Sequence, residues 1–192
     1  MPAPERTSLD EIAAAALELL DEGGLGALTM QAVATRVGVR APSLYKRVAD
    51  RTALVERVFL ACAAELDAVM RAAAERAGSD GGDRIVAIVV AARDYAHASP
   101  HRYHLIFGGV VTDADPAALE RSAEPIVAAC RALVGPDRAL DAARTVTAWA
   151  QGFLLMELSG SFRLGGDVEQ AFLRGARWIA DALVADRDQR LP

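Results

Sequence analysis

The sequence predicts an all-α fold, with a small three-helix domain at the amino terminus and a larger helical domain after it. Much of the 53% hydrophobic fraction is alanine, the residue that loses least entropy in a helix. The one strand-like run of β-branched residues, 85–90, lies within a longer helical pattern. At 192 residues, the chain can form one large domain or two small ones that share a core.

The first helix is marked at both ends. Ser8 and Glu11 have the spacing of a capping box, in which each side chain pairs with the backbone N–H of the other residue. An apolar stripe follows, and Gly23-Gly24 is expected to end the helix. Thr29 then supplies the N-cap of a second short helix, which runs to about residue 37.

The next helices are separated by glycine-rich turns. A tight turn at Gly38 precedes a third helix over about 41–48, and Asp50 caps a long fourth helix that reaches about residue 76. The Gly/Asp-rich stretch 78–82 is the clearest break in the chain. Beyond it the pattern predicts helices at about 83–98, 101–108, 116–134, 137–160 and 167–186.

Residues 29–48 have the arrangement of a helix-turn-helix, in which the second of two short helices lies in the major groove of DNA. In that second helix, Leu44 and Val48 are four residues apart and are expected to pack on the first two helices. The side chains between them then face outward. The alternative interpretation is a small helical bundle with a solvated basic face.

A local cluster of cations supports the DNA-binding interpretation. The formal net charge of −5 argues against a generally polyanion-binding surface, yet five cations fall close together: Arg36, Arg40, Lys46, Arg47 and Arg51. Lys46, the sole lysine, and Arg47 suit phosphates or the O6/N7 edge of guanine. The hydroxyls of Ser43 and Tyr45 suit phosphates, which position a helix without reading sequence.

Further contacts are expected around this helix. Thr29 presents its backbone N–H and hydroxyl at a helix start, and Arg51 adds a phosphate contact from the first turn of the fourth helix. Arg40, in the turn, contacts a base or a phosphate. The candidate DNA-binding residues are Thr29, Gln31, Arg40, Ala41, Pro42, Ser43, Tyr45, Lys46, Arg47 and Arg51.

Residues 8–60 resemble the DNA-binding domain of the TetR family of repressors. The resemblance is carried by residues 12–20, by Gly23-Gly24-Leu25, by Leu28–Ala34, by the turn and reading helix at 38–48, and by Asp50–Val55. One departure is Arg47-Val48, where many members have His-Phe. The resemblance implies a homodimer that binds an inverted-repeat operator in double-stranded DNA. Repression is the family's usual mode, activation is the alternative, and a helical adaptor that does not bind DNA is the alternative on the same frame.

The resemblance also implies that helices four to seven enclose a cavity for a small effector, which we expect to be mainly apolar. The candidates for contact with it are bulky or polar side chains on inward stripes, namely Tyr103, His104, Phe107, Trp149, Phe153 and Met156. Ordinary core packing is the alternative at each of these positions.

The last two helices carry apolar residues on more than one face, over 146–158 and 172–183. A second copy of the chain would cover the outer side, and the resemblance implies a homodimer through these two helices. Cover within one chain is the alternative. The run Trp149-Ala150-Gln151-Gly152 resembles a TetR subgroup named for a Trp-His-Gly motif, although Gln151 stands in place of the histidine.

Metal and disulfide chemistry are not expected. His97, His101 and His104 fall within eight residues, but Pro100 interrupts the helix between the first two, and no cysteine or carboxylate cluster lies nearby. We therefore expect half-exposed histidines and no zinc site. Cys62 and Cys130, the two cysteines, are expected to be buried thiols rather than a disulfide. No cofactor is expected.

The sequence also argues against an enzyme and against a membrane protein. It has no Gly-x-Ser-x-Gly, no His-Glu-x-x-His and no phosphate loop. It shows no signal peptide and no apolar stretch of the ~20 residues that span a bilayer, so we expect a cytoplasmic protein. We expect a DNA-binding domain over 1–50 and a ligand-sensing and dimerisation domain over 51–192.

Overall fold

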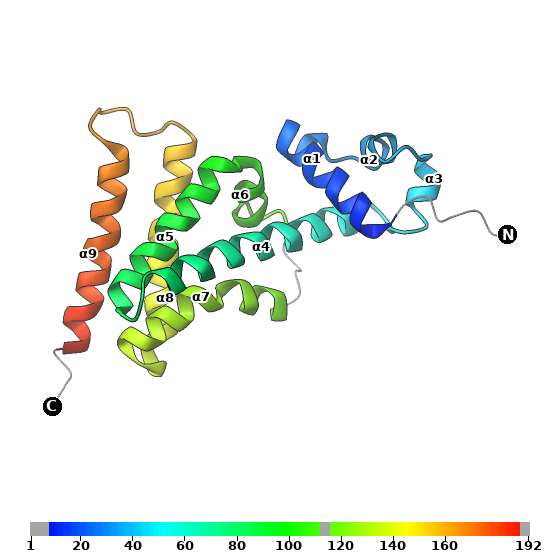
Figure 1. The fold of residues 1–192 in the computed structure, drawn as a ribbon. Coiled ribbons are helices and arrows are strands. Elements are labelled where there is room, and N and C mark those ends of the chain that lie inside the picture. Colours follow the sequence, from blue (N-terminus) through cyan, green and yellow to red (C-terminus); the bar gives the residue numbers. More distant parts are fainter. Residues whose placement is uncertain (1–7, 112–115, 189–192) are drawn as a thin grey trace. The chain divides into compact units, whose positions relative to one another are not determined.

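The computed structural model describes residues 8–111 and 116–188, and within these residues the chain is helical with no strand (Figure 1). The all-α prediction is confirmed, and the strand-like run 85–90 lies inside a helix. The helices are α1 (Leu9–Ala27), α2 (Met30–Arg36), α3 (Ala41–Leu44), α4 (Arg51–Arg76), α5 (Gly81–Ala98), α6 (Pro100–Phe107), α7 (Pro116–Val134), α8 (Pro136–Leu158) and α9 (Val168–Asp188).

Helix α3 is shorter than the sequence suggested, because it ends at Leu44 rather than near Val48. The backbone N–H groups of Arg47 and Val48 both donate to the carbonyl of Leu44, at 2.9 and 3.0 Å. The chain therefore leaves α3 through a turn. Asp50 then caps α4 as predicted, because its carboxylate accepts from the backbone N–H of Ala53 at 2.9 Å.

The start of α1 is the predicted capping box. The Ser8 hydroxyl accepts from the backbone N–H of Glu11 at 3.1 Å, and the Glu11 carboxylate accepts from the backbone N–H of Ser8 at 2.7 Å. The prediction that Gly23-Gly24 ends the helix was wrong in part. Both glycines leave the helical region, but a further helical turn follows to Ala27, so they kink α1.

Gly24 occupies a conformation that only glycine adopts readily, with φ 65° and ψ −165°. A Cβ added there would also lie 3.1 Å from Nδ1 of His101. Gly24→Ala is therefore expected to lower the free energy of unfolding by about 1–3 kcal/mol, as measured by urea denaturation. Gly26→Ala is the matched control, because a Cβ at Gly26 meets nothing within 4 Å. That change should leave stability unchanged or raise it by up to about 1 kcal/mol, and equal effects at the two glycines would contradict this account.

The chain divides into two compact units. The first unit contains α1, α2, α3, the part of α4 through Ala63, and α6; the second contains the rest of α4 with α5, α7, α8 and α9. These units differ from the division at residue 50 that we expected from the sequence. The difference arises because α6 packs against α1, and the first turns of α4 join the core of the first three helices.

The first unit has one apolar core, to which every one of its helices contributes. Leu44 and Val48 are buried in it, which confirms the inward face predicted for the third helix. Leu105 of α6 belongs to the same core. Its fully buried members include Ile12, Leu20, Leu28, Val33, Leu54 and Val58.

The core of the second unit is formed by α5, α7, α8 and α9, which pack against one another. The ring of Phe172 lies 5.1 Å from that of Trp149 and 5.2 Å from that of Phe153, centroid to centroid. Cys130 is buried in this unit and Cys62 in the first, and the burial of both side chains was predicted. Burial raises the pKa of the Cys130 thiol to about 11. None of the described helices is long and apolar enough to cross a membrane.

Candidate DNA-binding interface

Helices α2 and α3 form the predicted helix-turn-helix, seen in blue to cyan in Figure 1. The Thr29 hydroxyl accepts from the backbone N–H of Ala32 at 3.1 Å and so caps α2. The turn is built on Gly38, whose φ of 73° favours glycine. It is closed by the backbone N–H of Val39, which donates to the carbonyl of Ala34 at 2.9 Å.

The side chains of α3 and of the turn after it divide between an inner and an outer face. Leu44 is only 1% exposed, whereas Tyr45 is 51% exposed. Ser43, Lys46 and Arg47 are also exposed. The chain thus presents two hydroxyls and two cations around a short helix whose apolar residues hold it in place, and cations and hydroxyls are the groups that contact phosphates and base edges.

Arg40, Ala41 and Pro42 lie at the start of α3. Arg40 is the N-cap residue and is exposed, and its side chain makes no capping hydrogen bond. Ala41 and Pro42 are small and lie at the first helical positions, where little bulk separates the backbone from an approaching surface.

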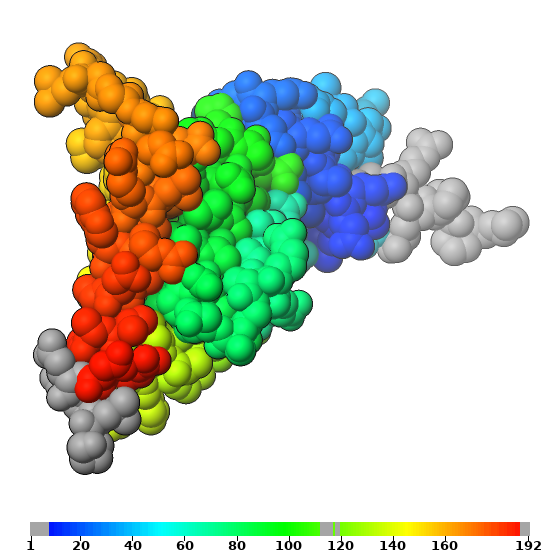
Figure 2. Space-filling model, turned by 60° about the vertical axis from the view of Figure 1, so that its left-hand side comes forward, coloured from blue at the N-terminus to red at the C-terminus, as the bar shows by residue number. Residues whose placement is uncertain are grey.

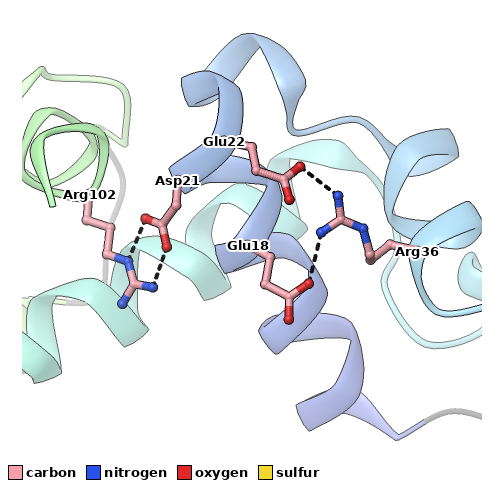
Figure 3. A network of polar contacts seen from close by, with 5 residues as sticks. All are labelled: Glu18, Asp21, Glu22, Arg36 and Arg102. Carbon is pink, nitrogen blue, oxygen red and sulfur yellow. Dashed lines mark hydrogen bonds and ion pairs between the residues drawn. The ribbon is translucent and has the colours of Figure 1, made fainter.

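Arg36 is exposed at the end of α2, but its charge is paired with two carboxylates of α1. Its guanidinium donates to the carboxylate of Glu18 at 2.9 Å and to that of Glu22 at 2.6 Å, as Figure 3 shows. The hydrogen bond from Arg36 lowers the pKa of Glu22, and the bonds to Glu22 and Glu18 raise that of Arg36. The two carboxylates balance the charge of Arg36 within the unit. Arg36 therefore adds little to the net positive charge of the basic cluster.

Arg51 also makes contacts that the sequence did not predict. Its Nε donates to the carbonyl of Leu28 at 2.8 Å, and Nη2 donates to the carbonyl of Leu25 at 2.9 Å. The predicted phosphate contact of Arg51 stays a prediction, but two of its donors are already used inside the unit.

The two candidates at α2 are placed differently. The backbone N–H of Thr29 donates to the carbonyl of Ala27 at 2.9 Å. The sequence predicted that the backbone N–H and the hydroxyl of Thr29 could both contact a phosphate. Because the N–H is already used, only the hydroxyl proton can make that contact. Gln31 is exposed near the start of α2, and its contact with DNA stays a prediction.

Three of the ligand-contact candidates lie on α6, in the first unit. Tyr103 is buried, and its ring centroid lies 4.7 Å from that of Phe107. His104 is exposed, with Nδ1 2.8 Å from the carbonyl oxygen of Pro100. On the same helix, Arg102 makes a two-pronged ion pair with Asp21 of α1, at 2.8 and 2.6 Å (Figure 3).

The other three ligand-contact candidates lie on α8, in the second unit. Trp149 and Phe153 are partly buried, with ring centroids 6.0 Å apart. Met156 is 47% exposed, so within one chain it is a surface residue. The role of all six candidates in ligand binding stays a prediction.

The second unit contains a largely buried ion pair that the sequence did not indicate. Arg93 of α5 donates to both carboxylate oxygens of Glu157 of α8, at 3.1 and 2.7 Å, and Nε2 of His97 lies 3.2 Å from the same carboxylate. Burial favours the neutral acid and acts to raise the pKa of Glu157, but the hydrogen bonds and charges of Arg93 and His97 lower it below its usual value. The guanidinium of Arg93 also lies over the ring of Phe172, 5.6 Å from its centroid.

The Glu157 pair predicts a pH-dependent stability. A carboxylate with a lowered folded-state pKa stabilises the fold above its unfolded value of 4.5 and loses that contribution as the pH falls through the folded value. Glu157→Gln is expected to cost about 1–3 kcal/mol at pH 7, where it leaves Arg93 without its counter-charge. This cost should shrink as the pH is lowered below 4.5, as measured by urea denaturation at each pH. Glu75→Gln, at an exposed position on α4, should have no such effect, and a pH-independent cost at Glu157 would contradict the assignment.

Helices α8 and α9 carry large apolar side chains that the rest of the described chain leaves exposed. Trp178 of α9 is 70% exposed and Leu140 of α8 is 51% exposed. In Figure 2, α9 is the orange-to-red column, and the part of it that the grey atoms leave visible faces the viewer. By contrast, Val146, Leu154, Phe172 and Ala176, which belong to the apolar pattern of these two helices, are covered within the chain.

The histidines are where the sequence suggested, at the surface. His97, His101 and His104 are all exposed. Among the described residues, no group of three or more His, Cys, Asp or Glu side chains is placed to hold a metal ion.

A helix-turn-helix that presents cations and hydroxyls to solvent, followed by a second helical unit, defines a DNA-binding regulator. Comparison with known proteins supports the same class of protein. Residues 12–58 match the family model of bacterial regulatory proteins of the tetR family, and residues 85–178 match that of the tetracyclin repressor-like carboxy-terminal domain. The second match does not confirm the Trp-His-Gly subgroup.

Individual proteins are also similar to this chain. An uncharacterized HTH-type transcriptional regulator of Mycobacterium tuberculosis is 29% identical over 82% of this chain and 73% of its own length. Among solved structures, BioQ of Mycobacterium smegmatis is similar at 25% identity and a TM-score of 0.72, over 93% of this chain and 98% of that one. A TetR variant of Acinetobacter baumannii, solved in complex with minocycline, shares the fold at 23% identity and a TM-score of 0.69, over 94% and 98% of the two chains. The chain belongs to the TetR family of transcriptional regulators.

Proposed function

We propose that this regulator is a ligand-responsive repressor, released from its operator by a small, mainly apolar molecule. The observation that carries the proposal is the exposed face of α3 and the turn after it. Ser43, Tyr45, Lys46 and Arg47 are exposed there, while Leu44 fixes the helix to the core. A regulator of this kind acts where the chromosome is, which for a bacterial regulator is the cytoplasm.

Arg47 and Lys46 read or neutralise DNA in this proposal, and the hydroxyls of Ser43 and Tyr45 position the helix on phosphates. Arg40 approaches the same groove from the start of α3, where Ala41 and Pro42 allow a close approach. The outward direction of these groups and the presence of cations among them support the assignment.

A homodimer through α8 and α9 presents two such faces. The uncovered Trp178, Leu140 and Met156 support this interface, because large apolar side chains left exposed on these helices favour burial by a partner. Two copies related by a two-fold axis would read an inverted repeat.

The effector is proposed to contact aromatic residues within one of the two units. Tyr103 and Phe107 of α6 offer apolar surface in the first unit, where His104 offers a polar group, and Trp149 and Phe153 of α8 offer apolar surface in the second. Met156 is exposed in a single chain and so contributes only where a partner covers it. Release requires that the effector bind the DNA-free form more tightly than the DNA-bound form, typically by ~1–3 kcal/mol.

The proposal is tested in two steps. Selection from a pool of random duplexes by the purified protein gives the enriched duplex, and fluorescence anisotropy then measures its affinity in the presence of a panel of small apolar compounds. A releasing compound should weaken binding by about 5–150-fold. If none of a broad panel changes the affinity while the duplex is bound tightly, the ligand-responsive part of the proposal fails and DNA binding stands.

A further inference from the structure

Arg51 joins two segments that lie on either side of the helix-turn-helix. It is the first residue of α4, and its guanidinium donates from Nε to the carbonyl of Leu28 and from Nη2 to the carbonyl of Leu25, at 2.8 and 2.9 Å. Leu25 lies in the last turn of α1, and Leu28 directly precedes Thr29, the N-cap of α2. One side chain thus connects the start of α4 with the turn between α1 and α2.

The electrostatics explain why a cation belongs here. The last carbonyls of a helix carry partial negative charge, and α1 has no basic residue in its own last turn. The Leu25 carbonyl accepts from the backbone N–H of Leu28 at 3.3 Å and still has a lone pair for Arg51. Arg51 supplies the missing cation from elsewhere in the chain. At the amino-terminal end of α4, a positive charge is unfavourable with respect to the helix dipole. The contacts of Arg51 with α1, rather than its place in α4, therefore explain why an arginine lies here.

We propose that Arg51 is a positioning residue for DNA reading. Its two hydrogen bonds fix the start of α2 relative to the start of α4, which follows α3 after a short turn. The helix-turn-helix is then held at both ends, and α3 is presented to DNA in one orientation. This inference rests on the proposed role of α3 as the reading helix.

The rival role, a phosphate contact, depends on the charge of Arg51, whereas positioning depends on its planar fork of donors. Arg51→Lys keeps the charge and loses the fork, and Arg51→Gln loses both. Under the proposal, both variants bind the enriched duplex about tenfold more weakly than the wild type. The slope of log K against log salt concentration stays that of the wild type, because no phosphate contact is lost. Arg57→Lys, at an exposed position farther along α4, is the matched control and should bind as the wild type does.

Two outcomes of the binding experiment would overturn the proposal. Wild-type affinity in Arg51→Lys would show that charge alone suffices. A salt slope smaller by about one in Arg51→Gln would show that Arg51 neutralises a phosphate.

A second readout does not depend on DNA. Amide hydrogen exchange over residues 25–33 should be faster in both Arg51 variants than in the wild type and in Arg57→Lys, since the turn loses its tie to α4. Unchanged exchange would overturn the proposal even if DNA binding fell. If the wild type itself selects no duplex, the proposed function fails, and the exchange of residues 25–33 alone decides whether Arg51 positions the turn.

Discussion

The double substitution Lys46→Ala and Arg47→Ala is expected to weaken binding of the enriched duplex by about 10²–10³-fold. Each of these cations contacts a guanine edge or a phosphate in the proposed complex, and a contact of either kind is worth about 1–3 kcal/mol. Both residues are exposed, so the free energy of unfolding should change by less than about 0.5 kcal/mol. Fluorescence anisotropy over a salt series, together with urea denaturation, measures both quantities.

The single variants Lys46→Ala and Arg47→Ala distinguish a phosphate contact from a base contact. A variant that weakens all duplexes alike and lowers the salt slope has lost a phosphate contact, whereas one that relaxes the preference at one base pair has lost a base contact. Arg76→Ala, in the last turn of α4, is the control and should bind DNA as the wild type does. The Nε of Arg76 donates to the carbonyl of Ala72 in its own helix. Wild-type affinity in the double variant would remove α3 from the reading role.

Trp178→Glu is expected to convert the proposed dimer into monomers. A tryptophan buried in an interface contributes about 2–4 kcal/mol when it is truncated. In a two-fold interface the change occurs twice, so the dissociation constant should rise by about 10³-fold or more. Analytical ultracentrifugation over a concentration series measures this shift. Since Trp178 is 70% exposed in the single chain, the monomer should remain folded.

Val110→Glu is the matched control for Trp178→Glu. Val110 is also an exposed apolar residue, at 45%, but it lies in the first unit. The control should sediment as the wild type does. A wild type that is monomeric at all concentrations, or a Trp178→Glu variant that dimerises like the wild type, would contradict an interface through α9.

The parts of the fold that follow from local sequence were predictable. The Ser8–Glu11 capping box, the Asp50 cap of α4 and the turn at Gly38 each depend on residues within a few positions of one another. The end of α3 was not predictable in this way, because residues 45–48 are as compatible with helix as with the turn that carries the chain into α4. The kink at Gly23 and Gly24 likewise depends on tertiary packing, since the ring of His101 lies against Gly24.

In the candidate site, too, local features were predictable from the sequence and long-range contacts were not. The inward direction of Leu44 and Val48 follows from their four-residue spacing, and with it the outward direction of Lys46 and Arg47. The partners of Arg36 are 14 and 18 residues away, and those of Arg51 are 23 and 26 residues away. No spacing rule identifies such contacts. The sequence therefore placed Arg36 in the basic cluster without indicating its two acidic partners.

The outer face of α9 shows the same limit. The apolar pattern of the last two helices predicted that part of their surface would remain for a partner, but it did not distinguish Phe172 from Trp178. The packing of α8 and α9 buries Phe172 and leaves Trp178 at the surface. The ion pair between Arg93 and Glu157 joins residues 64 positions apart, so neither residue alone indicated it.

The most direct test of the central claim is the sequence of the duplexes that the purified protein selects from a random pool at moderate salt. Two copies reading through α3 predict an inverted repeat, with half-sites about one helical turn, or a multiple of it, apart. The Lys46→Ala and Arg47→Ala double variant should enrich no motif under the same conditions. If the wild type enriches no motif, or only binds duplexes of any sequence in a salt-sensitive manner, the claim that this helix-turn-helix reads an operator is contradicted.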